Sequence, residues 1–124
     1  WLDMGFTGES MVTNEARDSS ISAISMPRMR ELFLGDVPID DPLASPLDAD
    51  LEGLPPLLIQ VGDEEVLLSD SLRFAEKATD AGVDVELKVW PEMFHVWHIC
   101  VGLFQEAADA IDEMVDFVRP RILL

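Results

Sequence analysis

The spacing of apolar residues changes character near residue 57. The run from Leu57 to Val61 is apolar and ends at Gly62, a pattern typical of a strand covered on both faces in a parallel sheet. A helix capped by Ser69 or its neighbour is predicted next, with Gly82 as its left-handed stop. Residues 83–89 then alternate apolar and polar side chains, which predicts a second strand nearer a sheet edge. Together these segments predict a right-handed βαβ unit.

Helices are also predicted on both sides of the βαβ unit. After the second strand, apolar residues at helical spacing predict a last amphipathic helix from about Val101 to Val118, halted by Pro120. The first 56 residues are rich in glycine and proline, so we expect mostly loop there. Within that loop region, short helices are predicted over 27–34 and, less clearly marked, over 21–25.

The predicted sheet is incomplete. A parallel sheet needs more than two strands to bury helices on both of its faces, and residues 1–56 offer no convincing strand. We therefore expect an α/β fold in which residues 57–124 form one edge of a larger sheet that is otherwise outside the chain. An open sheet face also predicts poor stability for the chain on its own.

Charge and composition exclude several classes of function. The net charge of −17 disfavours binding to nucleic acid or to an anionic membrane, because both repel such a chain. No apolar run approaches the length of a membrane-spanning helix, and residues 1–10 do not resemble a secretion signal. The single cysteine, Cys100, excludes an internal disulfide and fits a reducing compartment, so we expect a cytoplasmic location.

Candidate chemistry gathers where the two predicted strands end. Glu64 and Glu65 follow the first strand, and His95 follows the second. Ligands of open α/β sheets bind beyond the carboxyl ends of the strands, where an acid can orient an imidazole that takes a proton from a nucleophile. Solvated acids and a structural histidine are the simpler interpretation of each residue taken alone.

Other kinds of site are disfavoured. His95 and His98 are three residues apart, but the segment lacks the HExxH pattern of zinc enzymes and convergent further ligands, so no metal site is expected. Glycine-rich phosphate-binding patterns are absent as well, and no cofactor is expected. We expect His98 to be structural.

Three successive blocks carry a family resemblance. LPPLLIQVGDEEVLLSDSLRFAEKATDAGVDVELKVWPEMFHVWH, residues 54–98, closely resembles the C-terminal portion of the α/β-hydrolase esterases related to hormone-sensitive lipase. DPLASPLDADLEGLPP, residues 41–56, is similar to the segment that leads into the strand bearing the triad acid in that family. WLDMGFTGESMVTNEARD, residues 1–18, is similar to the stretch after an earlier strand. The HGGG oxyanion loop and the GxSxG nucleophile motif of these enzymes are not in the chain.

The resemblance assigns candidate triad residues. WPEMFH matches the family pattern in which the histidine closely follows the strand, which gives His95, although Glu92 stands where the family usually has glycine. Aligning on LLSDS places the acid at Glu65, whereas counting from Gly62 favours Glu64. We choose Glu65. Ser10, in Gly8-Glu9-Ser10, lacks the surroundings of a nucleophile and is expected to be a loop or capping residue.

The resemblance implies a serine carboxylic ester hydrolase acting on small esters or lactones without a cofactor. Since the nucleophile and oxyanion loop are absent, we expect this chain to be a C-terminal fragment of one domain, spanning 1–124, that is inactive alone. Two alternatives remain open: a non-catalytic acidic binding module derived from a hydrolase, and a subunit that completes a site with a partner chain. In relatives the last strand often pairs across a dimer interface, which implies a possible homodimer here.

Overall fold

The computed structural model describes residues 1–122 and contains the predicted βαβ unit. Strand β1 spans Leu57–Gly62, helix α3 spans Leu68–Asp80 and strand β2 spans Val85–Trp90. The two strands are parallel, with Leu57 opposite Val85 and Gly62 opposite Trp90. This arrangement brings the segments that follow both strands to the same end of the sheet, as the sequence predicts.

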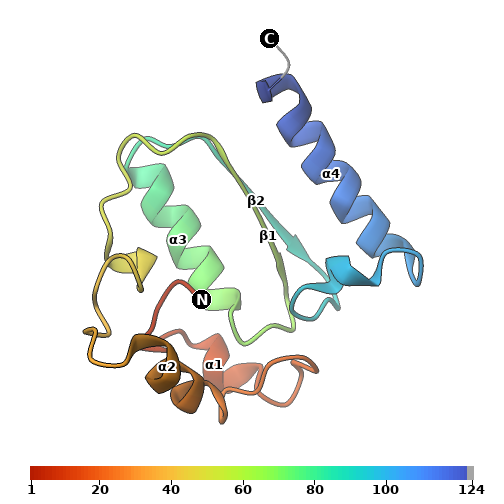
Figure 1. Ribbon diagram of the computed structural model, residues 1–124. Coiled ribbons are helices and arrows are strands. Elements are labelled where there is room, and N and C mark those ends of the chain that lie inside the picture. The colour runs from red at the N-terminus through yellow and green to blue at the C-terminus, as the bar shows by residue number, and fades with distance from the viewer. Residues whose placement is uncertain (123–124) are drawn as a thin grey trace.

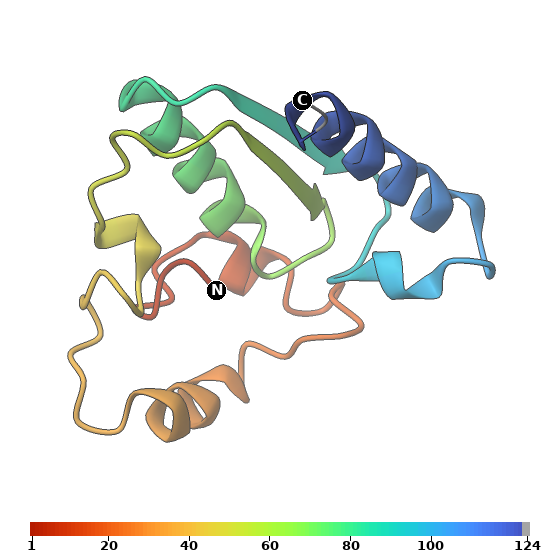
Figure 2. The ribbon, with the colours of Figure 1, turned by 45° about the horizontal axis from the view of Figure 1, so that its top comes forward.

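Helices cover both faces of the two strands. Figures 1 and 2 show β1 and β2 between α3 on one side and α4, Gln105–Ile122, on the other. On the α3 side, Leu57 and Val85 pack against a cluster centred on Leu51, Ala78 and Val83. On the α4 side, Gln60 reaches the helix directly, because its side-chain amide donates a hydrogen bond to the Ala110 carbonyl at 3.1 Å. Side chains therefore alternate between the two helices along β1.

The core of residues 1–122 consists of four separate small clusters. One of them joins Trp97 to Ala107 and Ala110 of α4, and all three side chains are fully buried. A second contains Met11, Met26, Val66 and Leu67, and so ties the N-terminal region to the start of α3. A domain of this length usually has one contiguous core, so the division fits a sheet that is incomplete within the described residues.

The first 56 residues contain only short helices, as expected. These are α1 over Ser10–Thr13, α2 over Met26–Leu34 and the 3₁₀ turn η1 over Pro46–Asp48. The prediction of α2 is confirmed, but the predicted helix over 21–25 is wrong, because those residues form irregular chain and a turn. Glu15 explains the difference: its carboxylate accepts hydrogen bonds from the Ser22 hydroxyl and the Ala23 N–H, which holds this segment as a turn.

Two boundaries of the last helix also differ from the prediction. Residues 97–100 form a separate 3₁₀ turn, η2, and α4 begins only at Gln105. Pro120 lies inside α4 rather than ending it. Proline removes one hydrogen bond of the last turn, and the Arg121 guanidinium makes other contacts there: it lies 3.7 Å from the centre of the Phe117 ring and donates to the Phe117 carbonyl at 2.6 Å.

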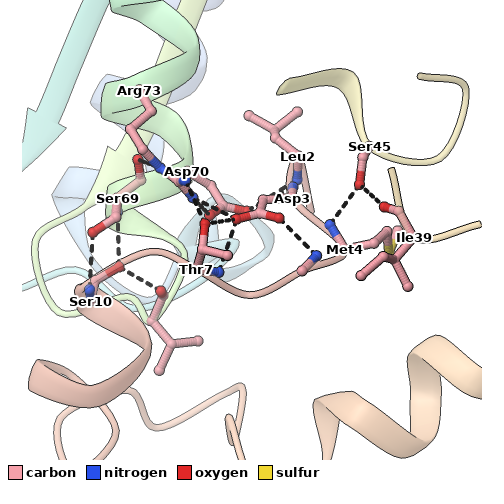
Figure 3. Close-up of polar contacts among 12 residues, drawn as sticks. Leu2, Asp3, Met4, Thr7, Ser10, Ile39, Ser45, Ser69, Asp70 and Arg73 are labelled. Carbon is pink, nitrogen blue, oxygen red and sulfur yellow. Dashed lines mark hydrogen bonds and ion pairs between the residues drawn. The ribbon is translucent and has the colours of Figure 1, made fainter. Parts of the chain in front are cut away.

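The N-terminal segment is fastened to α3 by buried polar contacts, which Figure 3 displays. The Asp70 carboxylate, on the first turn of α3, accepts hydrogen bonds from the backbone N–H groups of Leu2 and Asp3. Arg73, one turn later, contacts both Asp3 and Asp70 at 2.9 Å. These contacts place Trp1 and Leu2 beside the end of β1, where the candidate site lies.

Candidate acid and histidine site

Glu65 and His95 lie in contact beyond the ends of the two strands. One carboxylate oxygen of Glu65, Oε2, is 2.8 Å from Nδ1 of His95. The other, Oε1, accepts the backbone N–H of Gly62 at 2.7 Å. The Glu65 side chain is only 4% exposed, whereas that of His95 is 33% exposed. The buried carboxylate is therefore held at both oxygens, and the imidazole it contacts is open to solvent on its other side.

Glu64 points elsewhere, although it precedes Glu65 directly. Its carboxylate forms an ion pair with Arg17 at 3.1 Å on the exposed side of the loop. Of the two acids that the sequence offered, the structure brings Glu65 to His95 and Glu64 to Arg17. This separation follows from the turn after β1, in which the Glu65 N–H donates to the Gly62 carbonyl.

Residues 91–98, which carry both histidines and are called the histidine loop, pass directly over the end of β1. A Cβ atom on Gly62 would lie 2.0 Å from the Met93 carbonyl oxygen, a distance that no side chain tolerates. The Glu92 N–H donates to the Asp63 carboxylate at 2.7 Å, and Glu92 adopts a left-handed conformation with φ of 60°. A glutamate thus takes the turn geometry that glycine favours, because Asp63 fixes its backbone.

The acid-bearing loop is held by residues from the N-terminal region. The Asn14 amide donates to the carbonyls of both Asp63 and Glu65 at 2.9 Å. Asp18 accepts the Val66 N–H at 2.9 Å. Burial raises the pKa of Asp18, but the backbone N–H groups of Val66, Ser20 and Ile21 and the Ser20 hydroxyl outweigh burial and lower it. Sequence reasoning did not single out Asn14 or Asp18, and their only signal was their place within the first block of the resemblance.

Ser10 is buried and forms hydrogen bonds to the segment between Glu65 and the start of α3. Its hydroxyl donates to the Val66 carbonyl at 2.6 Å and accepts the Ser69 N–H at 2.8 Å, and the residue is 3% exposed. The start of α3 is therefore capped by Ser10 from another segment. The predicted cap at Ser69 or its neighbour is wrong, since the residue before α3 is Leu67, which forms no side-chain cap, and the Ser69 hydroxyl instead accepts the Ser10 N–H.

An open pocket of about 220 Å³ adjoins the pair. It is lined by Glu65 and His95, by Trp1 and Leu2 from the N-terminal segment, and by Trp97 and His98. Since Nδ1 of His95 faces Glu65, the opposite nitrogen, Nε2, is left for a proton donor. An imidazole oriented by a carboxylate beside a pocket can act as a general base. Among residues 1–122, no group of three or more histidine, cysteine or acidic side chains is placed to hold a metal ion.

His98 lies next to this pair without joining it. Its Nε2 is 2.9 Å from the side-chain oxygen of Gln60, and its ring stacks on that of Trp97 with centroids 4.0 Å apart. Burial lowers the pKa of His98, the Glu65 charge raises it, and the His95 charge lowers it further, with a net decrease. The two histidines therefore have different partners, although they are three residues apart.

Comparison with known proteins identifies relatives for most of the chain. A protein family described as having the alpha/beta hydrolase fold matches residues 1–99. An acetyl-hydrolase from Streptomyces hygroscopicus is 43% identical over 96% of the chain, and an esterase from Acinetobacter venetianus is 37% identical over 94%. The chain spans 40% and 39% of these two proteins, respectively.

Solved structures agree with these relatives. The crystal structure of an esterase from the bacterial hormone-sensitive lipase family is 44% identical and superposes with a TM-score of 0.97 over 99% of the chain. A hormone-sensitive lipase from a metagenome library is 40% identical, with a TM-score of 0.93 over 98% of the chain. The chain covers 41% and 42% of these structures. The expected resemblance and the partial α/β-hydrolase fold are both confirmed.

Proposed function

This chain belongs to the α/β-hydrolase fold family, and on that premise we propose that it supplies the acid and the base of a serine carboxylic ester hydrolase. The observation that carries the proposal is the 2.8 Å contact between a buried Glu65 carboxylate and Nδ1 of His95. Ester hydrolysis through a serine uses an acid and an imidazole in this arrangement.

The proposed roles follow from the geometry of the pair. His95 Nε2 takes the proton from a serine hydroxyl as that oxygen attacks the ester carbonyl, and later returns it to the leaving alcohol. Glu65 Oε2 accepts the Nδ1–H, which fixes the tautomer and stabilises the imidazolium. A glutamate does the work of the usual aspartate with one more methylene.

The serine and the oxyanion donors are proposed to come from outside these 124 residues. No GxSxG or HGGG pattern occurs in the sequence, and the Ser10 hydroxyl is buried and engaged both as a donor and as an acceptor. We expect the chain alone to hydrolyse esters at a negligible rate. Turnover of a p-nitrophenyl ester by the purified chain that His95→Ala abolishes would contradict this expectation.

The proposed substrates are small carboxylic esters with short to medium acyl groups, or lactones. Relatives named acetyl-hydrolase and esterase support this class. The charge of −17 supports a neutral small molecule over nucleic acid as the partner. Among residues 1–122, α4 and every other helix is too short or too polar to cross a membrane. The cytoplasmic location expected from the single cysteine remains part of the proposal.

A chimera tests whether these residues can perform the reaction. Residues 1–124 replace the matched segment of the Streptomyces hygroscopicus acetyl-hydrolase, which supplies the rest of the enzyme. We expect the chimera to hydrolyse p-nitrophenyl acetate. His95→Ala should lower kcat by roughly 10³-fold or more, because the substitution removes the proposed general base.

Glu64 provides the matched control for the acid. Glu65→Gln keeps the shape of the side chain but removes the charge facing His95, so we expect a large loss in kcat with little change in KM. Glu64→Gln changes the neighbouring residue in the same way and should leave kcat within about twofold, since exposed ion pairs contribute little. Equal losses in the two variants would refute the assignment of Glu65.

A subunit that completes a site with a second chain is the other candidate. The 220 Å³ pocket beside His95 is open, and β2 has β1 as its neighbour on one side only within the described residues. A free strand edge favours association with another strand, so we include a homodimer formed through β2 in the proposal. Sedimentation velocity at increasing protein concentration tests it, and a monomer at all concentrations would count against the dimer.

A further inference from the structure

Gln60 connects the second histidine to helix α4. The residue lies in the middle of β1 with its side chain on the α4 side. Its amide nitrogen donates to the Ala110 carbonyl and to the Glu113 carboxylate, both at 3.1 Å. Its amide oxygen, Oε1, is 2.9 Å from His98 Nε2. One side chain of β1 thus contacts both α4 and His98.

The partners of Gln60 determine where the proton of His98 lies. Ala110 and Glu113 both present oxygen acceptors, so the NH₂ group must face them and the amide oxygen must face His98. An amide oxygen can only accept, which means that His98 Nε2 carries a hydrogen. Glu65 likewise can only accept, so His95 carries its hydrogen on Nδ1. When neutral, the two rings are opposite tautomers.

Charges around His98 favour the neutral ring. Burial lowers the pKa of His98 and the neighbouring His95 lowers it further, whereas the Glu65 charge raises it. Glu113 of α4 is separated from the ring by the Gln60 amide, and Lys88 of β2 lies opposite Gln60 in the sheet register. Trp97, on which the ring stacks, contributes no charge.

The backbone between the two histidines needs external support. Val96 adopts φ of 58°, a left-handed conformation that is unfavourable for a β-branched residue. Trp97 is fully buried against Ala107 and Ala110. His98 is then fastened to Gln60. The loop that carries His95 is therefore strained at Val96 and held in place on its far side by Trp97 and His98.

We propose that Gln60 and His98 form a positioning pair that holds His95 against Glu65. Gln60 and His98 also line the pocket beside His95, and the proposed role of the pair is to act through the loop that carries His95. Gln60 belongs to β1, the strand that Glu65 follows, and it holds the histidine loop through His98. The positions of the Glu65 carboxylate and the His95 imidazole are therefore both set by β1. A role of this pair in catalysis rests on the proposed ester hydrolase function. The geometry of the pair can be tested without measuring any activity.

Nuclear magnetic resonance of the ring nitrogens tests the geometry in the wild-type chain. His95 and His98 are the only histidines in the sequence, so ¹⁵N-labelling of histidine gives two resolvable ring systems. At pH 7.5 we expect His95 to be protonated on Nδ1 and His98 on Nε2 alone. A doubly protonated His98, an Nδ1–H tautomer of His98, or two rings with the same tautomer distribution would overturn the proposal.

Substitutions of His98 separate positioning from general stabilisation. His98→Phe keeps a ring to stack on Trp97 but removes the donor, and we expect the minor tautomer of His95 to rise by roughly fivefold, the factor for one net hydrogen bond. His98→Gln retains an N–H donor for Gln60 and should restore the wild-type ratio. A His95 spectrum that is unchanged in His98→Phe would overturn the proposal, as would failure of His98→Gln to differ from His98→Phe.

Gln105→Leu is the matched control for Gln60→Leu. Both replace a glutamine amide that donates to a carboxylate, Glu113 for Gln60 and Asp109 for Gln105, but Gln105 is exposed and its amide bonds within α4 rather than to a histidine. Only Gln60→Leu should alter the tautomer ratio of His95. These outcomes are independent of the ester hydrolase proposal, because an inactive chimera with the expected tautomers would refute the function and leave the positioning pair standing.

Discussion

At the scale of single residues, glycine at position 62 is required by the backbone that crosses it. The Met93 carbonyl lies where a Cβ atom would be, and the residues that follow Met93 carry His95. The sequence marked Gly62 only as the end of a strand. The close approach that makes this glycine indispensable belongs to two segments 31 positions apart and could not be predicted from either one.

Gly62→Ala should therefore damage the site as well as the fold. The added methyl group must displace backbone rather than a flexible side chain, so we expect a loss of about 2 kcal/mol or more in the free energy of unfolding. The contact between Glu65 and His95 should be lost too, visible as a change in the ring-nitrogen signals of His95. Urea denaturation measures the first effect.

Gly102→Ala is the control for this substitution. Gly102 has φ of 89° but no atom within 4 Å of an added Cβ. Only backbone strain of roughly 1 to 2 kcal/mol is expected there, with unchanged His95 signals. If both variants alter His95 equally, steric displacement by Met93 is not the reason that Gly62 is needed.

At the scale of elements, the contacts between the N-terminal segment and α3 depend on pH. Burial raises the pKa of Asp3, but hydrogen bonds from the Thr7 hydroxyl, Arg73 and the backbone of Thr7 and Gly5 outweigh it and lower the pKa from 3.8 to about 2. A carboxyl whose folded pKa is depressed stabilises the fold above its unfolded pKa. That stability is lost as the pH falls from about 3.8 to about 2.

Asp3→Asn isolates this contribution. The amide keeps the size of the side chain but cannot ionise, so the variant should be less stable than the wild type at pH 6 and should approach it at pH 2. Urea midpoints of both proteins between pH 6 and pH 2 measure the difference in stability. Because the other acids titrate in both proteins, their contributions cancel in this difference. A difference in stability that stays constant with pH would contradict the role of the Asp3 charge.

The periodicity of the sequence predicted β1, α3, β2 and α2 to within two residues at most ends, because each has a regular apolar pattern. The departures from the prediction lie where particular side chains intervene. Ser10 caps α3 from another segment, Glu15 holds residues 22 and 23 as a turn, and Arg121 contacts Phe117 within the last turn of α4, around Pro120. None of these contacts has a periodic signature in the sequence.

At the scale of the whole molecule, the chain exposes more surface than a typical protein of its length. Its accessible surface is 7550 Å², against about 6,600 Å² expected for a folded monomer of this size. Part of the excess is apolar and lies along α4, where Val115, Val118 and Ile122 are 40%, 43% and 68% exposed. The predicted poor stability of the isolated chain has this physical basis.

Val115→Lys should reduce non-specific association without unfolding the chain. The side chain is partly exposed on α4, so the change in unfolding free energy should stay within about 0.5 kcal/mol while binding of a hydrophobic dye falls. Ala107→Lys, on the buried side of the same helix against Trp97, should cost about 3 kcal/mol or more. Equal effects on thermal unfolding would show that the two faces of α4 are not distinct in solution.

The sequence by itself determined the βαβ unit, its incomplete sheet, the family resemblance and the residue types at both strand ends. Regular spacing and local motifs carry that information. Only the tertiary structure decided that Glu65 rather than Glu64 contacts His95, and that Gln60 contacts His98. The reason is geometric: adjacent residues in a turn point in different directions, and which of them meets the imidazole depends on how the loop over Gly62 is held.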